Sequence, residues 1–207
     1  MTVLELGEKP PLVTRRGLLI GGGAAIGLVV AWSIWPRDYR PSLAVAEGEH
    51  AFNGYVKIGT DGHVTVVVPQ IEQGQGIYTV LAQTVADELG ADWRTIAIEA
   101  APVNPHYANT LFAEECGYAS LTPRPEADGR FQVTGASTSL RGFGARCREA
   151  GALARAMLCM AAAKDWDADW QACDTENGFV VRGNDRVRFA EIAARAAKMT
   201  PPDHAPF

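Results

Sequence analysis

A glutamine between two glycines, Gln75 flanked by Gly74 and Gly76, is the first feature of the sequence that could do chemistry. Glycines let a ligand approach the backbone closely, and a side-chain amide can both donate and accept hydrogen bonds. A helical pattern of apolar residues begins directly afterwards, at Ile77. Because the first N–H groups of a helix have no partner within it, this junction favours an anionic or strongly polar ligand.

A second polar junction carries a glycine, Gly135, followed by three hydroxyl-bearing residues, Ser137, Thr138 and Ser139. A long helical pattern starts beside them, and Arg141 lies within its first turn, where an arginine is well suited to bind phosphate. The sequence therefore repeats one arrangement, in which a short strand feeds a polar helix N-terminus.

Each junction also has an ordinary structural interpretation. The first can be a plain strand-to-helix loop with a glycine N-cap, and it lacks the usual dinucleotide fingerprint because Thr79 occupies the position of the third glycine. The hydroxyls of the second can simply be N-caps. The spacing of these residues alone leaves both interpretations open.

The surrounding pattern predicts the elements that position these residues. Two strands at 55–58 and 63–68 form a hairpin that leads to the first junction. The helix that starts at Ile77 runs to about Leu89, Gly90 ends it, and a strand follows over 93–101. Strand, helix and strand in this order indicate an α/β or α+β layer with helices covering a sheet. Of the two we predict the α+β fold, with helices packed on a mixed sheet.

The second half of the chain is predicted in less detail. Residues 102–132 are rich in proline and loop-like, which makes them functional or a contact surface for another chain, and His106 within them is interpreted as an exposed loop histidine. A short strand at 131–133 precedes the long helix. A closing helix spans 189–199.

Composition separates a folded domain from its ends. The chain has 207 residues, 47% of them hydrophobic, and a formal net charge of -5, so it lacks a basic footprint for nucleic acid. We predict a separate N-terminal segment over 1–50, a folded domain over 51–200 and a linker-like end over 201–207. The four cysteines lack the spacing of a zinc or iron–sulfur site; Cys147 fits a core position, and a disulfide, for instance with Cys116, is allowed.

The first residues resemble a twin-arginine export signal. Arg15 and Arg16 stand directly before an apolar, glycine-rich run over 17–35. This segment predicts an N-terminal export helix and a protein that is periplasmic, or anchored to the inner membrane and facing the periplasm. Cleavage after the small residues at 44–46 and retention as an anchor both stay open.

The two junctions together resemble one protein family. Residues 72–79, Glu-Gln-Gly-Gln-Gly-Ile-Tyr-Thr, resemble the E-M-G-Q-G-(apolar)-(aromatic)-T loop of the molybdenum hydroxylases, the xanthine dehydrogenase and aldehyde oxidase superfamily. Residues 134–141 resemble its T-G-(G/A)-S-T-S-x-R segment. Residues 166–180 resemble its short helix followed by a hairpin with an E-N-G turn, which here continues to residue 188. The nearest resemblance is to the large subunit of the isoquinoline 1-oxidoreductase and membrane-bound aldehyde dehydrogenase branch, although Gln73 replaces the usual methionine.

This resemblance implies a molybdenum pyranopterin, commonly as the cytosine dinucleotide, and oxidation of an aldehyde or N-heterocycle with oxygen from water. Gln75 would then hydrogen-bond an oxygen ligand of the metal, without being a direct metal ligand. The backbone at Gly74 and Gly76 would contact the cofactor. Its pterin or pyrophosphate part would be held by four residues of the second junction: Gly135, Ser137, Thr138 and Ser139.

The resemblance also implies partners, because the family's general-base glutamate lies near the far end of the large subunit and has no counterpart in this chain. We expect the chain alone to be inactive and to work with the remaining part of the large subunit as a separate chain, an iron–sulfur [2Fe–2S] small subunit and a cytochrome c. The alternative hypothesis is a non-catalytic exported module that keeps the fold and binds only a nucleotide-like ligand or a partner protein.

Overall fold

The computed structural model describes residues 40–116 and 132–204, which belong to one compact unit spanning 39–207. The twin-arginine segment lies outside the described residues. Within the part that is described, no helix combines the length and apolar character needed to cross a membrane. The folded unit begins before residue 51, because strand β1 (Glu49–Ala51) already pairs with its neighbour.

A four-stranded mixed sheet forms the centre of the fold, in the order β1, β2 (Val56–Gly59), β3 (Val64–Val68) and β4 (Ile96–Ala100). The first three strands are antiparallel, which confirms the predicted hairpin, and β4 runs parallel to β3. β4 is shorter than predicted. The side chain of Asp92 accepts a hydrogen bond from the backbone N–H of Arg94, and this cap makes the first predicted strand residues a 3₁₀ helix, η1 (Trp93–Thr95).

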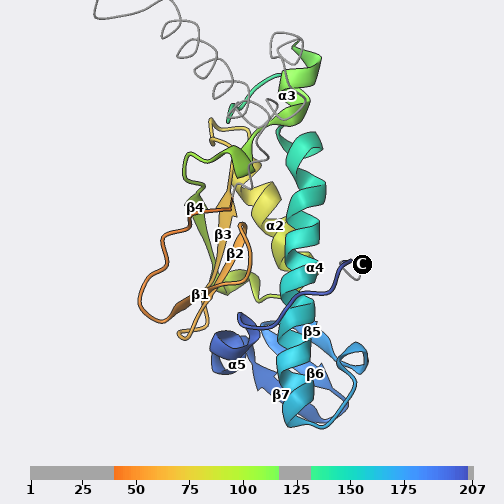
Figure 1. Cartoon of the computed structure of the whole chain (residues 1–207). Coiled ribbons are helices and arrows are strands. Elements are labelled where there is room, and N and C mark those ends of the chain that lie inside the picture. The colour runs from red at the N-terminus through yellow and green to blue at the C-terminus, as the bar shows by residue number, and fades with distance from the viewer. Residues whose placement is uncertain (1–39, 117–131, 205–207) are drawn as a thin grey trace, which may run out of the picture. The chain divides into compact units, whose positions relative to one another are not determined.

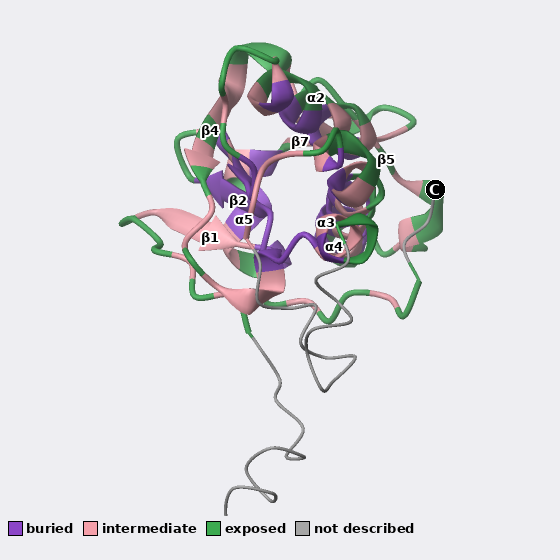
Figure 2. Cartoon of the chain, turned by 90° about the horizontal axis from the view of Figure 1, so that it is seen from above, coloured by how far each residue is buried: buried purple, intermediate pink, exposed green. Residues whose placement is uncertain are grey.

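Two helices, α2 (Ile77–Leu89) and α4 (Ser139–Asp165), pack on the sheet and on each other (Figure 1). α2 has the predicted bounds, and Gly90 ends it in a left-handed conformation with φ of 67°. The helices approach closely at Gly151, where an added Cβ would lie 2.9 Å from the carbonyl oxygen of Val85. Buried residues gather between the sheet and these helices (Figure 2), so the α+β prediction is confirmed.

A second, three-stranded antiparallel sheet consists of β5 (Asp174–Glu176), β6 (Phe179–Arg182) and β7 (Asp185–Arg188). Asn177 and Gly178 both have positive φ, 49° and 79°, as the predicted tight Asn-Gly turn requires. The backbone N–H of Gly178 donates to the carbonyl oxygen of Gly90, which ties this hairpin to the end of α2. The closing helix α5 (Phe189–Ala196) ends before the predicted Met199.

The predicted loop over 102–132 contains two short helices, η2 (Pro105–Tyr107) and α3 (Thr110–Glu115). An asparagine side chain caps each of them, Asn104 and Asn109 respectively. The strand predicted at 131–133 is wrong in its described part, residues 132 and 133. The carbonyl oxygen of Val133 accepts hydrogen bonds from side chains instead of joining a sheet.

Lys57 is a buried charge on the sheet, with 2% of its surface exposed. Its ammonium group contacts the carboxylates of Glu99 at 2.6 Å and Glu49 at 2.9 Å, and donates to the carbonyl oxygen of Ala44 at 3.0 Å. Burial opposes the charged form, but the hydrogen bonds that the ammonium donates to Glu99 and Glu49 outweigh it and raise the pKa of Lys57. The ammonium therefore joins β1, β2, β4 and the segment before β1.

We expect Lys57→Met to lower the free energy of unfolding by about 3 kcal/mol, because removing one partner of a buried ion pair leaves the other charges uncompensated. Glu99 is partly exposed, which keeps the loss at the lower end of that range. Urea denaturation at about pH 7 measures it. Lys164→Met, at an exposed position of α4, is the matched control. Equal losses in both variants would contradict a structural role of the buried ammonium.

Candidate functional site

The two polar junctions lie side by side. The backbone N–H of Ile71 donates to the hydroxyl of Thr134 at 2.8 Å, and the hydroxyl of Ser139 donates to Oε1 of Gln70 at 2.7 Å. Nε2 of Gln70 donates to the carbonyl oxygen of Val133 at 3.4 Å and to that of Pro69 at 2.9 Å. The structure thus places the predicted residues of the first loop, 69–76, beside those of the second loop, 133–139.

These contacts bring the N-termini of α2 and α4 to one end of the domain (Figure 1). The positive ends of both helix dipoles therefore face the same region, which favours negative charge there. Gly74 and Gly76 have φ of 94° and 80°, values that favour glycine, and an added Cβ at either would meet no atom within 4 Å. A ligand can therefore approach the backbone of the first loop.

Glu72 is the internal acceptor of the first loop. One carboxylate oxygen accepts from the backbone N–H of Gly74 at 2.7 Å and of Gly76 at 2.9 Å, and the other accepts from Tyr78 at 3.0 Å. These hydrogen bonds, that of Tyr78 first, lower the pKa of Glu72. The backbone N–H groups of Gly74 and Gly76, which were predicted to contact a cofactor, are thus bound to a carboxylate of the chain itself.

Gln75 is exposed, as a ligand-binding side chain must be, but its amide is used within the loop. Nε2 donates to the carbonyl oxygen of Ile71 at 2.8 Å, and Oε1 accepts from the backbone N–H of Gln73 at 2.5 Å. Binding of a ligand oxygen by Gln75 therefore requires its amide to exchange at least one of these contacts.

The second loop separates its three hydroxyls. Ser137 is exposed and has a positive φ of 54°, whereas Ser139 is half-buried and bound to Gln70. Thr138 is fully buried; its hydroxyl donates to the carbonyl oxygen of Gly135 at 2.8 Å and accepts from Asn109 at 2.7 Å. Ser137 is thus the hydroxyl that a ligand can reach, and Thr138 holds the turn.

Several observations go beyond the sequence analysis or correct it. His106 is not an exposed loop histidine, because its ring packs against Tyr55 and Tyr107 with centroids 5.6 Å and 5.0 Å away. Arg141 is ion-paired with Glu115 at 2.5 Å.

All four cysteines are free thiols, and Cys147 is buried as predicted. Over residues 40–116 and 132–204, no group of three or more His, Cys, Asp or Glu side chains could hold a metal ion.

The structure also identifies Gln70, Glu72 and Asn109 as residues that organise the site, which sequence reasoning missed. Gln70 is a polar residue directly after Pro69 at the end of a buried strand, and this unusual position is the one sequence signal for it. The open space beside Gly74 and Gly76, the two helix N-termini and the exposed Gln75 and Ser137 fit a large anionic cofactor bound across both loops.

We expect Gln70→Leu to destabilise the fold by about 2 kcal/mol, because it leaves the half-buried Ser139 hydroxyl without its acceptor and removes one of the two donors to the Val133 carbonyl. Thermal or urea unfolding measures the change. Gln73→Leu, at an exposed position in the same loop, is the control and should stay within about 0.5 kcal/mol of wild type. A wild-type stability for Gln70→Leu would show that the loops are joined by other contacts.

We expect Glu72→Gln to lower the urea midpoint at about pH 7. In the wild type three backbone N–H groups share the two oxygens of the carboxylate, whereas an amide offers them only one acceptor oxygen. The folded-state pKa of Glu72 is lowered, so its stabilisation is complete above the unfolded pKa of about 4.3 and is lost as the pH falls through the folded pKa. The difference from wild type should therefore shrink between about pH 5 and pH 3.

Glu47→Gln, at an exposed position, serves as the control for this pH series. Equal midpoints of wild type and Glu72→Gln at about pH 7 would contradict the capping role of the carboxylate.

Comparison with known proteins assigns the chain to a family. Residues 20–106 match the model of a molybdopterin cofactor-binding domain, and these residues contain Gly74, Gln75 and Gly76. The chain is 31% identical over 201 residues to the isoquinoline 1-oxidoreductase subunit beta of Brevundimonas diminuta, with 93% of this chain and 23% of the relative covered. It is 27% identical over 191 residues to the membrane-bound aldehyde dehydrogenase (pyrroloquinoline-quinone) of Gluconacetobacter polyoxogenes, with 88% and 21% covered.

Two solved structures are also similar. Quinoline 2-oxidoreductase from Pseudomonas putida 86 matches with a TM-score of 0.48 and 23% identity, over 72% of this chain and 17% of that one. The Cu,Mo-CO dehydrogenase matches with a TM-score of 0.47 and 20% identity, over 90% and 24%. The chain spans about a quarter of the length of the curated relatives. By the match of its domain and its curated relatives, the chain carries a molybdopterin cofactor-binding domain of the molybdenum hydroxylase family.

Proposed function

We propose that this chain is the cofactor-binding portion of an exported molybdenum hydroxylase large subunit, which oxidises an aldehyde or an N-heterocycle with oxygen from water. The observation that carries the proposal is the meeting of the loops 69–76 and 133–139 at two helix N-termini, in a domain of the molybdopterin-binding type. The names of the two curated relatives, an isoquinoline oxidoreductase and an aldehyde dehydrogenase, support the substrate classes.

In this proposal the cofactor, when bound, supplies the oxidation chemistry, and the chain binds and orients it. Gln75 would hydrogen-bond an oxygen ligand of the metal, after its amide leaves Ile71 or Gln73. Ser137 would hold the pterin or pyrophosphate part from the second loop, with the backbone at Gly135 and Ser139. The dinucleotide form is proposed because α4 begins beside the second loop without a side-chain cap, so that its first N–H groups suit a pyrophosphate.

Glu72 would act as a positioning residue and not as the general base. Its carboxylate accepts three backbone hydrogen bonds and has a lowered pKa, both of which oppose proton uptake at neutral pH. We propose that the remaining part of a large subunit supplies the base. A [2Fe–2S] subunit and a cytochrome c would take the electrons onward, and the twin-arginine segment supports export to the periplasm or the inner membrane.

Cofactor analysis of the natively purified protein tests the proposal. We expect molybdenum in stoichiometric amount, release of cytosine monophosphate after acid treatment, and co-purification of large-subunit and iron–sulfur polypeptides. Because the name of one relative includes pyrroloquinoline quinone, the same sample is assayed for that quinone. A protein without molybdenum or such partners would overturn the proposal and favour the non-catalytic binding module.

We expect Gln75→Ala to lower oxidation of benzaldehyde or isoquinoline by about tenfold or more, because it removes a hydrogen bond directed at the reacting centre. Extracts of cells that carry only the variant gene are assayed with an artificial electron acceptor. Stability should change little, since the two loop hydrogen bonds that the variant removes are exposed to water. Gln73→Ala is the control within the loop. Unchanged oxidation by Gln75→Ala, with molybdenum retained, would remove Gln75 from the proposed site.

A further inference from the structure

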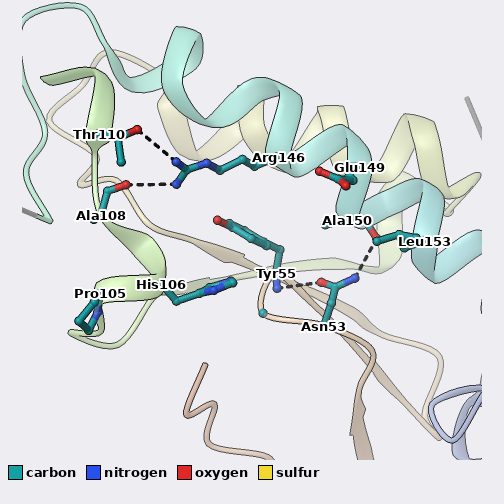
Figure 3. A pocket seen from close by; sticks show the side chains of 11 residues that line it. Asn53, Tyr55, Pro105, His106, Ala108, Thr110, Arg146, Glu149, Ala150 and Leu153 are labelled. Carbon is teal, nitrogen blue, oxygen red and sulfur yellow. Dashed lines mark hydrogen bonds between the residues drawn. The ribbon is translucent and has the colours of Figure 1, made fainter. Parts of the chain in front are cut away.

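A cavity of about 410 Å³ is lined by residues outside the two loops of the candidate site (Figure 3). Three elements form it: the segment 53–55 before β2, the η2 region 105–110 and the face of α4 that carries Arg146, Glu149, Ala150 and Leu153. Its volume falls in the range of small-molecule sites, roughly 300–1,000 Å³. It is open to solvent on one side, so a ligand can enter.

The walls of this cavity suit a flat ring. Tyr55 and His106 present two aromatic rings, tilted by 48° with centroids 5.6 Å apart, and Pro105, Ala108 and Leu153 add apolar surface. Burial first, and then the charge of Arg146, lowers the pKa of His106, so its ring is neutral at pH 7. Burial raises the pKa of Tyr55 to about 12, so its phenol stays protonated and can donate a hydrogen bond.

One fixed positive charge faces this surface. Arg146 donates from Nη1 to the carbonyl oxygen of Ala108 at 3.1 Å and from Nη2 to the hydroxyl of Thr110 at 3.3 Å (Figure 3). Both acceptors are uncharged, and among the described residues Arg146 forms no salt bridge. Arg146 also hydrogen-bonds the phenol of Tyr55. These contacts together use only part of the guanidinium's N–H donors and hold the group in place, which leaves it able to bind a carboxylate.

A negative charge stands near that arginine. Glu149 follows Arg146 by three residues on α4, is exposed, and lines the same cavity. It opposes a ligand of high negative charge, so the cavity selects for a single anionic group. Asn53 contributes little to recognition, because its amide already bonds the carbonyl oxygen of Ala150 and the backbone N–H groups of Tyr55 and Val56.

We propose that this cavity binds a planar aromatic or heteroaromatic molecule with one carboxylate, which pairs with Arg146 while its ring lies against Tyr55, His106 and the apolar wall. The inference does not rest on the molybdenum cofactor, since no residue of the loops 69–76 or 133–139 lines the cavity.

Titration of the full 207-residue chain with benzoate, followed by NMR or calorimetry, tests the proposal. We expect saturable binding with a dissociation constant of about 1 mM or tighter. Benzamide, which lacks the charge, and cyclohexanecarboxylate, which lacks the aromatic ring, should each bind several-fold more weakly. Absence of saturable benzoate binding, or equal binding of benzamide, would overturn the proposal.

Three variants locate the site. Arg146→Met should weaken benzoate binding by about tenfold or more, because it removes a charge-assisted hydrogen bond. Glu149→Gln should strengthen it, because a repelling charge is removed at an exposed position that does not affect folding. Tyr55→Phe keeps the ring and should weaken binding less than Arg146→Met does. Should Arg146→Met fail to fold, Glu149→Gln decides: unchanged or weaker binding would contradict the proposed site.

Discussion

The buried amide of Gln70 is the interaction on which the arrangement of the candidate site depends. Gln70 lies just after β3 and bonds Val133 and Ser139, which are 63 and 69 positions farther along the chain. Together with the hydrogen bond from the Ile71 N–H to the Thr134 hydroxyl, it holds the polar loops before α2 and α4 against each other. The N-termini of the two helices therefore lie at one region, and an exposed glutamine and serine share that region. A buried side chain and one backbone N–H thus bring two local motifs into one site.

Sequence patterns predicted the elements that local chemistry determines. The bounds of α2 follow from an apolar stripe that ends at Gly90, and the β5–β6 turn follows from an Asn-Gly pair that tolerates positive φ. The predictions were wrong where side chains from distant segments determine the local backbone structure. Residues 132 and 133 read as a strand, but side chains of Gln70 and Asn109 take the Val133 carbonyl.

The candidate site shows the same division. Residue types identified Gln75 and the hydroxyls as polar groups at helix starts, and the structure brings them together. Which of those hydroxyls is buried and which is exposed could not be predicted. The burial of Thr138 and the exposure of Ser137 depend on a turn with two consecutive left-handed residues, Ala136 and Ser137. His106 read as an exposed loop residue because its two tyrosine neighbours contact it only in the folded chain.

The segment 108–110 connects the cavity at Arg146 with the second loop. The carbonyl oxygen of Ala108 and the hydroxyl of Thr110 hold the guanidinium of Arg146, while Asn109, between them, donates to Thr138 and to the Val133 carbonyl. A contiguous set of hydrogen bonds therefore runs from the cavity to the turn that presents Ser137. Such a set transmits binding energy only where one of its members has two discrete arrangements. Ala136 and Ser137, with φ of 51° and 54°, are the residues of this turn in a strained left-handed conformation, so we expect any coupling between the cavity and the second loop to act there.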